Sequence, residues 1–184
     1  HLENGHYLAV DIEISANTKP GNVVFTILNQ GKSSSINWPL QPRRKDRGTA
    51  FAQGLTSADL VYFLMPDRFS NGDSNNDKIP GLKDQSLNRG EIFLRHGGDL
   101  QGVANHLDYM QKLGVTSLWM TPVVENDMPD RTEHGYAATN NYKIEKRFGG
   151  DIAYLNLSDS IHNKGMKLVQ DIVYNHFGRF HFLV

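Results

Sequence analysis

Residues 99–122 read DLQGVANHLDYMQKLGVTSLWMTP and decide the fold class of most of the chain. Apolar residues recur at helical spacing over 100–113, and Asp99 stands before them as an N-cap candidate. A glycine follows this pattern, as is common at the C-terminal end of a helix. The apolar run 115–120 comes next and is stopped by Pro122, which is typical of a strand buried on both faces. The stretch therefore predicts a helix over 100–113 followed by a buried strand.

The alternation of strand and helix continues on both sides of this stretch. Residues 59–65 form a short apolar run that predicts an earlier strand. Residues 151–163 predict a second helix closed by Gly165, and residues 166–173 predict a third strand. Strands that alternate with helices in this way form right-handed βαβ units around a parallel sheet. The sequence therefore predicts an α/β fold from about residue 58 onward.

The first forty residues have a different character. Residues 7–14 alternate in part and residues 22–28 are a second β-rich run, each followed by a turn signal. These segments predict antiparallel strands of a β-sandwich, and because a pair of strands is marginally stable, we expect further strands upstream. Residues 39–54 are polar and basic, which favours a solvated linker over a surface for an acidic partner.

Composition excludes several classes of protein. The chain has 184 residues, of which 39% are hydrophobic, so disorder as a whole is excluded. The formal net charge of -1 argues against a nucleic-acid or anionic-membrane partner, because both need a basic excess. No apolar run approaches the roughly 20 residues that span a bilayer. Without cysteine there is neither a disulfide framework nor a thiolate metal site.

Polar side chains collect where the predicted strands end. The segment 66–69, PDRF, follows the first strand, and Asp171, Asn175 and His176 close the third. In βα architectures the chemistry gathers at the C-terminal ends of the strands. The convergence predicts a functional site at this edge, although the same residue types also end strands for purely structural reasons.

Two further motifs lie in the loops. Residues 71–77, NGDSNND, place carboxylate and amide oxygens around a glycine, as a hard cation such as Ca²⁺ requires. The same residues also make solvated turns, and taken alone they favour a turn. Residues 134–136, HGY, hold a tyrosine that can stack on a sugar and a histidine that can donate to hydroxyls. Taken alone, a histidine and a tyrosine in a loop are more often ordinary surface residues.

Taken together and in order, these motifs resemble the alpha-amylase family, glycoside hydrolase family 13. The resemblance runs over residues 59–176 and is closest to the neopullulanase and cyclomaltodextrinase branch. It rests on YFLMPDRF at 62–69, NGD at 71–73, ND at 76–77, GGDLQG at 97–102, LGVTSLWMTP at 113–122, HGY at 134–136, RFGG at 147–150 and DIVYNH at 171–176.

The resemblance implies both the fold and its division into domains. Residues 46–184 would supply the first three βα units of a (β/α)₈ TIM barrel, truncated after the third strand. Residues 1–45 would be the last strands of an N-terminal immunoglobulin-like β-sandwich together with a linker. The chain is therefore expected to combine the end of one domain with the beginning of another.

The resemblance also implies roles for individual residues. A calcium site is expected from two segments, with ligands from Asn71, Asp73, Asn76, Asp77, Gly97 and Asp99. Substrate contacts are expected from His134, Tyr136, Asp171 and His176. Asn175 matches an asparagine that supports structure or a second calcium ion in relatives. Asn140 stands where relatives often have an acid, so no role is carried over to it.

The carboxylate pair of a retaining glycosidase is not among the matched motifs. Such enzymes need a nucleophile and a general acid/base about 5 Å apart. In the family these residues follow strands four and five, so no residue of this chain is assigned either role. We expect the chain to be part of a longer protein and to be inactive alone.

For the whole protein, the resemblance implies retaining hydrolysis of α-1,4-glucans such as starch, maltodextrins, cyclodextrins or pullulan. A homodimer and a periplasmic or secreted bacterial location are further expectations. One alternative is a non-catalytic relative that binds carbohydrate or serves a transporter, although the intact sugar-contacting residues argue against it. Another is a small α/β binding module complete in itself.

Overall fold

The computed structural model describes residues 8–43, 45 and 54–184. The chain forms two compact units, His1–Gly54 and Leu55–Val184, which are described separately. The predicted domain boundary between residues 45 and 46 falls beside residues outside this description, so it stays a prediction. Within the described part, no helix is long and apolar enough to cross a membrane.

The first unit is built on one antiparallel hairpin. Strand β1 (Gly21–Asn29) pairs with β2 (Lys32–Leu40) in a register that joins Gly21 to Leu40. Gln30 and Gly31 make the turn with positive φ angles of 48° and 77°, the conformation that tight hairpin turns require. The predicted strand over 22–28 and the turn that follows it are confirmed.

The prediction of a strand over 7–14 is wrong for its described residues. Residues 8–14 form no strand, and the alternating side chains of Leu8, Val10 and Ile12 are exposed. A strand needs a neighbour to take up its backbone hydrogen bonds, and β1 pairs with β2 alone among the described residues. The alternating pattern over 8–14 therefore did not produce a strand, because no described strand pairs with this segment.

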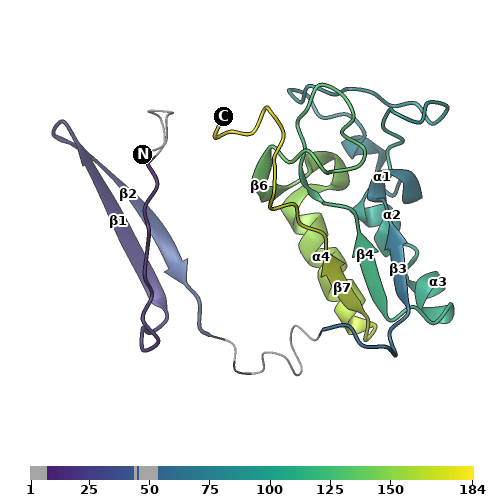
Figure 1. Cartoon of the computed structure of the whole chain (residues 1–184), viewed down its shortest axis with the longest axis horizontal. Coiled ribbons are helices and arrows are strands. Elements are labelled where there is room, and N and C mark those ends of the chain that lie inside the picture. The colour runs from purple at the N-terminus through teal and green to yellow at the C-terminus, as the bar shows by residue number, and fades with distance from the viewer. Residues whose placement is uncertain (1–7, 44, 46–53) are drawn as a thin grey trace. The chain divides into compact units, whose positions relative to one another are not determined.

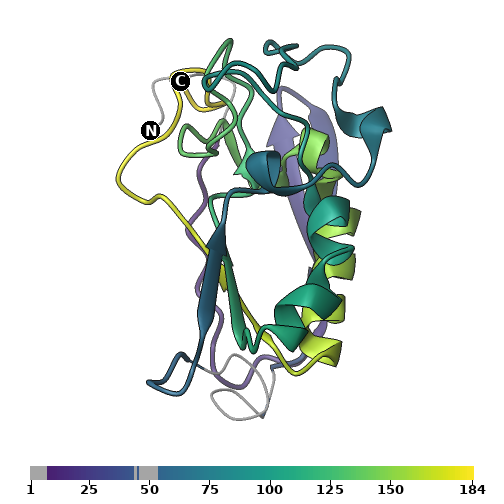
Figure 2. The same ribbon diagram turned by 90° about the vertical axis from the view of Figure 1, so that its right-hand side faces the viewer.

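The second unit contains a parallel sheet of three strands. Strand β4 (Ser117–Met120) lies between β3 (Val61–Leu64) and β7 (Lys167–Gln170), and both pairings are parallel. Helices α2 (Leu100–Ala104), α3 (Leu107–Lys112) and α4 (Gly150–Asn163) lie along one face of this sheet, as Figures 1 and 2 show. The predicted α/β order of three parallel strands is confirmed.

The core lies between the sheet and the helices. Val103, Met110 and Leu118 are fully buried there, so the helical pattern read from the sequence does face the sheet. On the other face, Phe63 and Trp119 pack edge to face with their ring centroids 4.8 Å apart and remain partly exposed. Apolar side chains thus project from both faces of the sheet, as the continuous apolar runs of the strands indicate.

A clamp at the amino-terminal ends of the strands ties all three together. The carboxylate of Asp59, just before β3, accepts a hydrogen bond of 2.9 Å from the Thr116 hydroxyl and one of 2.8 Å from the Lys167 ammonium. Because of the bond from Lys167 above all, the pKa of Asp59 lies well below its usual range. We call this group the Asp59 clamp.

The predicted helix over 100–113 is wrong as a single element. It is two short helices, α2 and α3, with the break at Asn105 and His106. The His106 backbone leaves helical geometry, with φ -110° and ψ 8°, while its ring Nδ1 donates to the Gly102 carbonyl at 2.8 Å. A side chain that bonds the preceding turn competes with the helical ladder, which the apolar spacing does not reveal.

Long loops at the carboxyl ends of the strands carry elements that the sequence did not predict. After β3 come α1 (Pro66–Phe69) and the 3₁₀ turn η1 (Ser74–Asn76). After β4, strand β5 (Val124–Glu125) pairs with β6 (Asn140–Ile144), and η2 (Lys146–Phe148) follows. The β5–β6 pair closes the base of the segment 126–139, which we call the HGY loop.

Candidate functional site

Tyr136 and Asp171 join two strand ends. The Tyr136 hydroxyl donates a hydrogen bond of 2.9 Å to Oδ2 of Asp171, which directly follows β7. The indole N–H of Trp119, on β4, donates to the same oxygen at 3.3 Å. Burial, together with the bond to Asp171, raises the pKa of Tyr136. The tyrosine therefore stays neutral and keeps its proton for Asp171.

His176 and His134 hold the backbone of Tyr136. Nε2 of His176 lies 2.9 Å from the Tyr136 carbonyl, so it donates, while Nδ1 lies 3.1 Å from the Asn175 amide nitrogen. Nδ1 of His134 accepts from the Tyr136 N–H at 2.9 Å. Burial lowers the pKa of His134, which keeps this nitrogen unprotonated. All four residues predicted to contact substrate are thus joined in one cluster.

A cavity of about 200 Å³ opens beside this cluster, lined by Pro122, Asp171 and Tyr174 among others. Gly135 brings the HGY loop against the end of β4: a Cβ there would lie 2.0 Å from the Pro122 carbonyl oxygen. The φ of Gly135 is also positive, at 82°. Only glycine fits this position, so the tyrosine beside the cavity depends on the small residue before it.

The oxygen-rich loop after β3 is tied to the start of α2 by Asp99. Its buried carboxylate accepts backbone N–H bonds from Gly72 at 3.0 Å, Asp73 at 2.9 Å and Gly102 at 2.6 Å. The Asn76 amide donates a fourth bond of 2.9 Å. Asp99 is therefore the N-cap that the sequence predicts, and it also fastens the loop to the helix.

Part of this loop fits a hard cation. Oδ1 of Asn76 is buried without a hydrogen-bond partner, and the side chains of Asn71 and Asp77 meet at 2.6 Å. A Cβ on Gly97 would lie 2.6 Å from Oδ1 of Asp77, so the Gly97 backbone approaches the same point. Amide, carboxylate and carbonyl oxygens are the ligands that calcium takes.

Besides Asp77, which accepts from Asn71, two more of the six predicted calcium ligands have carboxylate oxygens that already accept hydrogen bonds. Both carboxylate oxygens of Asp99 are occupied by N–H donors, and Oδ1 of Asp73 accepts two bonds from Asn75. In the described part of the chain, no group of three or more His, Asp or Glu side chains is placed to hold a metal ion. A site in this loop would therefore depend on amide and backbone oxygens as much as on carboxylates.

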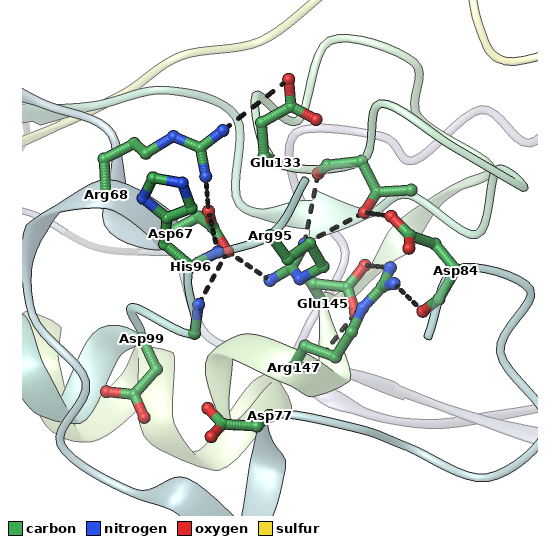
Figure 3. A network of polar contacts seen from close by, with 12 residues as sticks. Asp67, Arg68, Asp77, Asp84, Arg95, His96, Asp99, Glu133, Glu145 and Arg147 are labelled. Atoms are coloured by element: carbon green, nitrogen blue, oxygen red, sulfur yellow. Dashed lines mark hydrogen bonds and ion pairs between the residues drawn. The ribbon is translucent and has the colours of Figure 1, made fainter. Parts of the chain in front are cut away.

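A buried polar network between these two regions was not found from the sequence (Figure 3). Arg147 bonds Glu145 at 2.9 Å through Nε, the Asp84 carbonyl at 2.9 Å and the Asn126 carbonyl at 2.9 Å. Arg95 lies 3.4 Å from Asp67, and both side chains are almost completely buried. The network thus links the loop after β3, the segment around Asp84 and the HGY loop.

The carboxylates of the network are stabilised in their charged form. Burial alone would raise the pKa of Asp84, but hydrogen bonds from Thr132 and Ser86 outweigh it and the pKa is lowered. For Glu145, burial is likewise outweighed by the hydrogen bond and charge of Arg147, so its pKa is also lowered. One signal for this network was available, since Arg147 belongs to the RFGG motif at 147–150, but no motif marked Arg95.

A family model described as "Alpha amylase, catalytic domain" matches residues 63–183. The chain belongs to the alpha-amylase family. A second model, described as "Cyclomaltodextrinase, N-terminal", matches residues 1–44. The resemblance to the cyclomaltodextrinase and neopullulanase branch is confirmed, and so is the predicted fold: the start of a (β/α)₈ barrel preceded by the end of a β-sandwich.

Among alpha-amylase relatives, the chain is 36% identical to the periplasmic alpha-amylase of Escherichia coli (strain K12), over 93% of this chain and 28% of that protein. It is 32% identical to a cyclomaltodextrinase of Thermoanaerobacter pseudethanolicus, over 72% of this chain and 22% of the relative. The chain therefore spans less than a third of the length of these relatives.

Solved structures agree with this placement. An Anoxybacillus alpha-amylase matches with a TM-score of 0.58 and 36% identity, over 68% of this chain and 26% of the other. A cyclic α-maltosyl-(1→6)-maltose hydrolase of Arthrobacter globiformis matches with a TM-score of 0.59 and 30% identity, over 68% and 27% of the two chains. Both cover about the same fraction of this chain.

Proposed function

We propose that this chain forms part of a retaining glycoside hydrolase that acts on α-1,4-glucans. The observation that carries the proposal is the cluster of His134, Tyr136, Asp171 and His176 beside a cavity at the carboxyl ends of the strands. The names of the relatives, alpha-amylase and cyclomaltodextrinase among them, support a starch-like substrate.

Each residue of the cluster has a role in this proposal. The ring of Tyr136 stacks on the apolar face of a glucose unit, and Asp171 keeps the ring in place through its bond to the hydroxyl. His176 is exposed and carries its proton on Nε2, so it donates to a sugar hydroxyl in exchange for the Tyr136 carbonyl. These groups bind and orient the sugar, whereas bond cleavage needs a carboxylate pair.

Asp171 is the one carboxylate among the described residues that line the cavity, and it is already bonded to Tyr136 and Trp119. The proposal therefore takes the nucleophile and the acid/base from the part of the whole protein that follows strand three of the barrel. The present chain alone is proposed to bind glucan and to have no hydrolytic activity.

Calcium is the proposed metal. Asn71, Asn76, Asp77 and the Gly97 carbonyl would hold it, supported by the unpartnered Oδ1 of Asn76. Asp73 and Asp99 complete the proposed set if their N–H bonds are exchanged. The ion would supply only structural support there, by fixing the loop after β3 to the start of α2.

Incubation of the full-length protein with starch, pullulan and cyclodextrin tests the proposed activity. Proton NMR of the first products should show the α-anomer, because a retaining mechanism keeps the configuration. A β-anomer would refute the retaining mechanism. Binding of maltoheptaose, an α-1,4-linked glucose heptamer, without turnover would favour the non-catalytic carbohydrate-binding alternative.

Two properties of the whole protein complete the proposal. A periplasmic or secreted bacterial location is supported by the relative from Escherichia coli, whose name calls it periplasmic. A homodimer is proposed from the cyclomaltodextrinase branch, and sedimentation of the full-length protein would test it.

A further inference from the structure

Arg95 connects the HGY loop to the end of β3 from within the protein. Its guanidinium Nη1 lies 3.3 Å from both the carbonyl and the hydroxyl oxygen of Thr132. Nη2 lies 3.4 Å from Asp67, and the guanidinium stands 5.1 Å from the centre of the Phe148 ring. Arg95 is 1% exposed, so water cannot take over these contacts.

The hydroxyl of Thr132 is the link between two charged groups. It accepts from Arg95 and donates a short bond of 2.6 Å to Oδ2 of Asp84. All three side chains are buried, with Thr132 also 1% exposed. In a buried setting the hydroxyl has no alternative partner, so its direction fixes the loop backbone at this residue.

Tyr136 lies four residues further along the same loop, and its own end is fixed by Asp171. We propose that Thr132, held by Arg95 and Asp84, is a positioning residue that sets the placement of Tyr136 for the sugar. The Tyr136 ring is then defined by two anchors, one at the end of β3 and one at the end of β7. This inference rests on the proposed glucan-binding function of the cluster.

The contacts of Arg95 fix the position of the loop more than they stabilise the fold. Nε and Nη2 of Arg95 make no hydrogen bond, and the pair with Asp67 is longer than a hydrogen bond of good geometry. Buried ion pairs with incomplete hydrogen bonding return little net stability after desolvation. What such contacts provide is a single defined conformation of the HGY loop.

Three variants separate placement from stability. Thr132→Val keeps the shape of the side chain and removes the hydroxyl, whereas Thr132→Ser keeps the hydroxyl. Thr116→Val is the matched control, because it removes a threonine hydroxyl from the Asp59 clamp at the opposite edge of the sheet. Each variant is made in the 184-residue chain, which is proposed to bind glucan without cleaving it, and is compared with the unsubstituted chain by melting temperature, hydrogen exchange and maltoheptaose calorimetry.

We expect Thr132→Val to speed amide exchange over 132–139 and to weaken maltoheptaose binding by about tenfold or more, as displaced binding groups do. Thr132→Ser should keep the exchange rate and the affinity within about twofold of the unsubstituted values, since its hydroxyl can make the same hydrogen bonds. Thr116→Val should lower the melting temperature and leave loop exchange and sugar binding unchanged.

Two results would overturn the inference. One is unchanged exchange over 132–139 in Thr132→Val, which would mean that the hydroxyl does not hold the loop. The other is an equal loss of affinity in Thr132→Val and Thr116→Val, which would reduce the effect to general destabilisation. If even the unsubstituted protein binds no maltoheptaose, the proposed function fails, while the exchange data still decide whether Thr132 places Tyr136.

Discussion

His176 combines an exposed ring with a defined tautomer, because Nε2 donates to the Tyr136 carbonyl and Nδ1 faces the Asn175 amide. Because the tautomer is set before the sugar arrives, the Nε2 proton can pass from the Tyr136 carbonyl to the sugar as charge develops in the transition state. The residue thus has the geometry of a group that acts on turnover more than on binding.

Replacement of His176 by alanine in the full-length protein should therefore lower kcat by more than it weakens ground-state binding. The measurement compares kcat with the affinity for a non-hydrolysed oligosaccharide. His162→Ala, on the exposed side of α4, serves as control and should change neither. Equal losses of kcat and affinity in His176→Ala would mean that the histidine only positions the sugar.

His134 gives the cluster a dependence on pH. Its pKa is lowered by burial, and its Nδ1 must be unprotonated to accept from Tyr136. A folded-state pKa below the ordinary value of about 6.5 means that this contribution is complete above that pH. As the pH falls through the lowered value, protonation breaks the bond.

We therefore expect maltoheptaose affinity to fall as the pH drops through the lowered pKa of His134, in step with the His134 titration followed by NMR. His134→Asn keeps an acceptor beside the Tyr136 N–H and should remove this step. A titration of His134 above its ordinary value would contradict the assignment.

At the scale of residues, the four residues of the proposed sugar-binding cluster were predicted from the sequence, but the side chains that hold the cluster were not. Tyr136 and His176 belong to short motifs of consecutive residues, which can be recognised from the sequence alone. Arg95 and Thr132 form their contact only because two distant loops are folded together, 37 positions apart in the chain. No spacing rule marks such a pair in advance.

Among the elements, the junction of α2 with the loop after β3 depends on Asp99. Replacing it by alanine leaves four N–H donors without their acceptor, so the free energy of unfolding should fall by about 2 kcal/mol or more. Chemical denaturation measures this loss. Asp108→Ala, at an exposed position of α3, is the control and should cost much less. A similar cost for both would show that the four bonds to Asp99 stabilise the fold no more than the contacts of an exposed acid do.

Calcium belongs to the same junction. A chelator should lower the melting temperature of the protein, because an ion bound by the folded state alone stabilises it by mass action. Asn76→Ala removes the unpartnered oxygen and should abolish the difference between calcium and chelator. If chelation leaves the unsubstituted protein unchanged, the proposed site is refuted.

The helices and strands themselves were predictable to different degrees. Strand β4 and helix α4 follow from apolar runs and their glycine or proline ends, which are local signals. The break between α2 and α3 was not predictable, since it depends on a contact from His106 to the preceding turn. Strands β5 and β6 are short and their pairing closes a loop, so neither carries an alternating pattern long enough to detect.

For the second unit as a whole, the buried network predicts sensitivity to acid. The pKa values of Asp84 and Glu145 are both lowered, so unfolded chains take up their protons at a higher pH than folded ones do. This stabilisation is complete above the ordinary pKa values and is lost as the pH falls through the lowered ones.

The melting temperature should therefore drop steeply below about pH 4, and Asp84→Asn should flatten the drop. Thermal scans over a pH series provide the measurement. Asp130→Asn, at an exposed position of the HGY loop, should leave the slope unchanged. A slope that is the same in Asp84→Asn and in the unsubstituted protein would exclude the network as its source.

The order of the parallel sheet was predictable because βα units follow one handedness and put neighbouring strands side by side. In the first unit, strand β1 and the turn after it were predicted from the sequence, whereas its partner β2 was not. What the sequence left open is which loops meet above the sheet, because that depends on buried charges such as Arg147 and Glu145, whose pairing appears only in three dimensions.

The indole of Trp119 makes the chain its own optical probe. One of the two tryptophans, Trp38, lies in the β1–β2 hairpin, and the other donates to the carboxylate that also receives the Tyr136 hydroxyl. A glucan that moves Tyr136 changes the charge distribution beside the indole ring and therefore the colour and intensity of its emission. With Trp38→Phe as a silent background, the arrival of sugar can be followed by ultraviolet light in real time, without any attached dye.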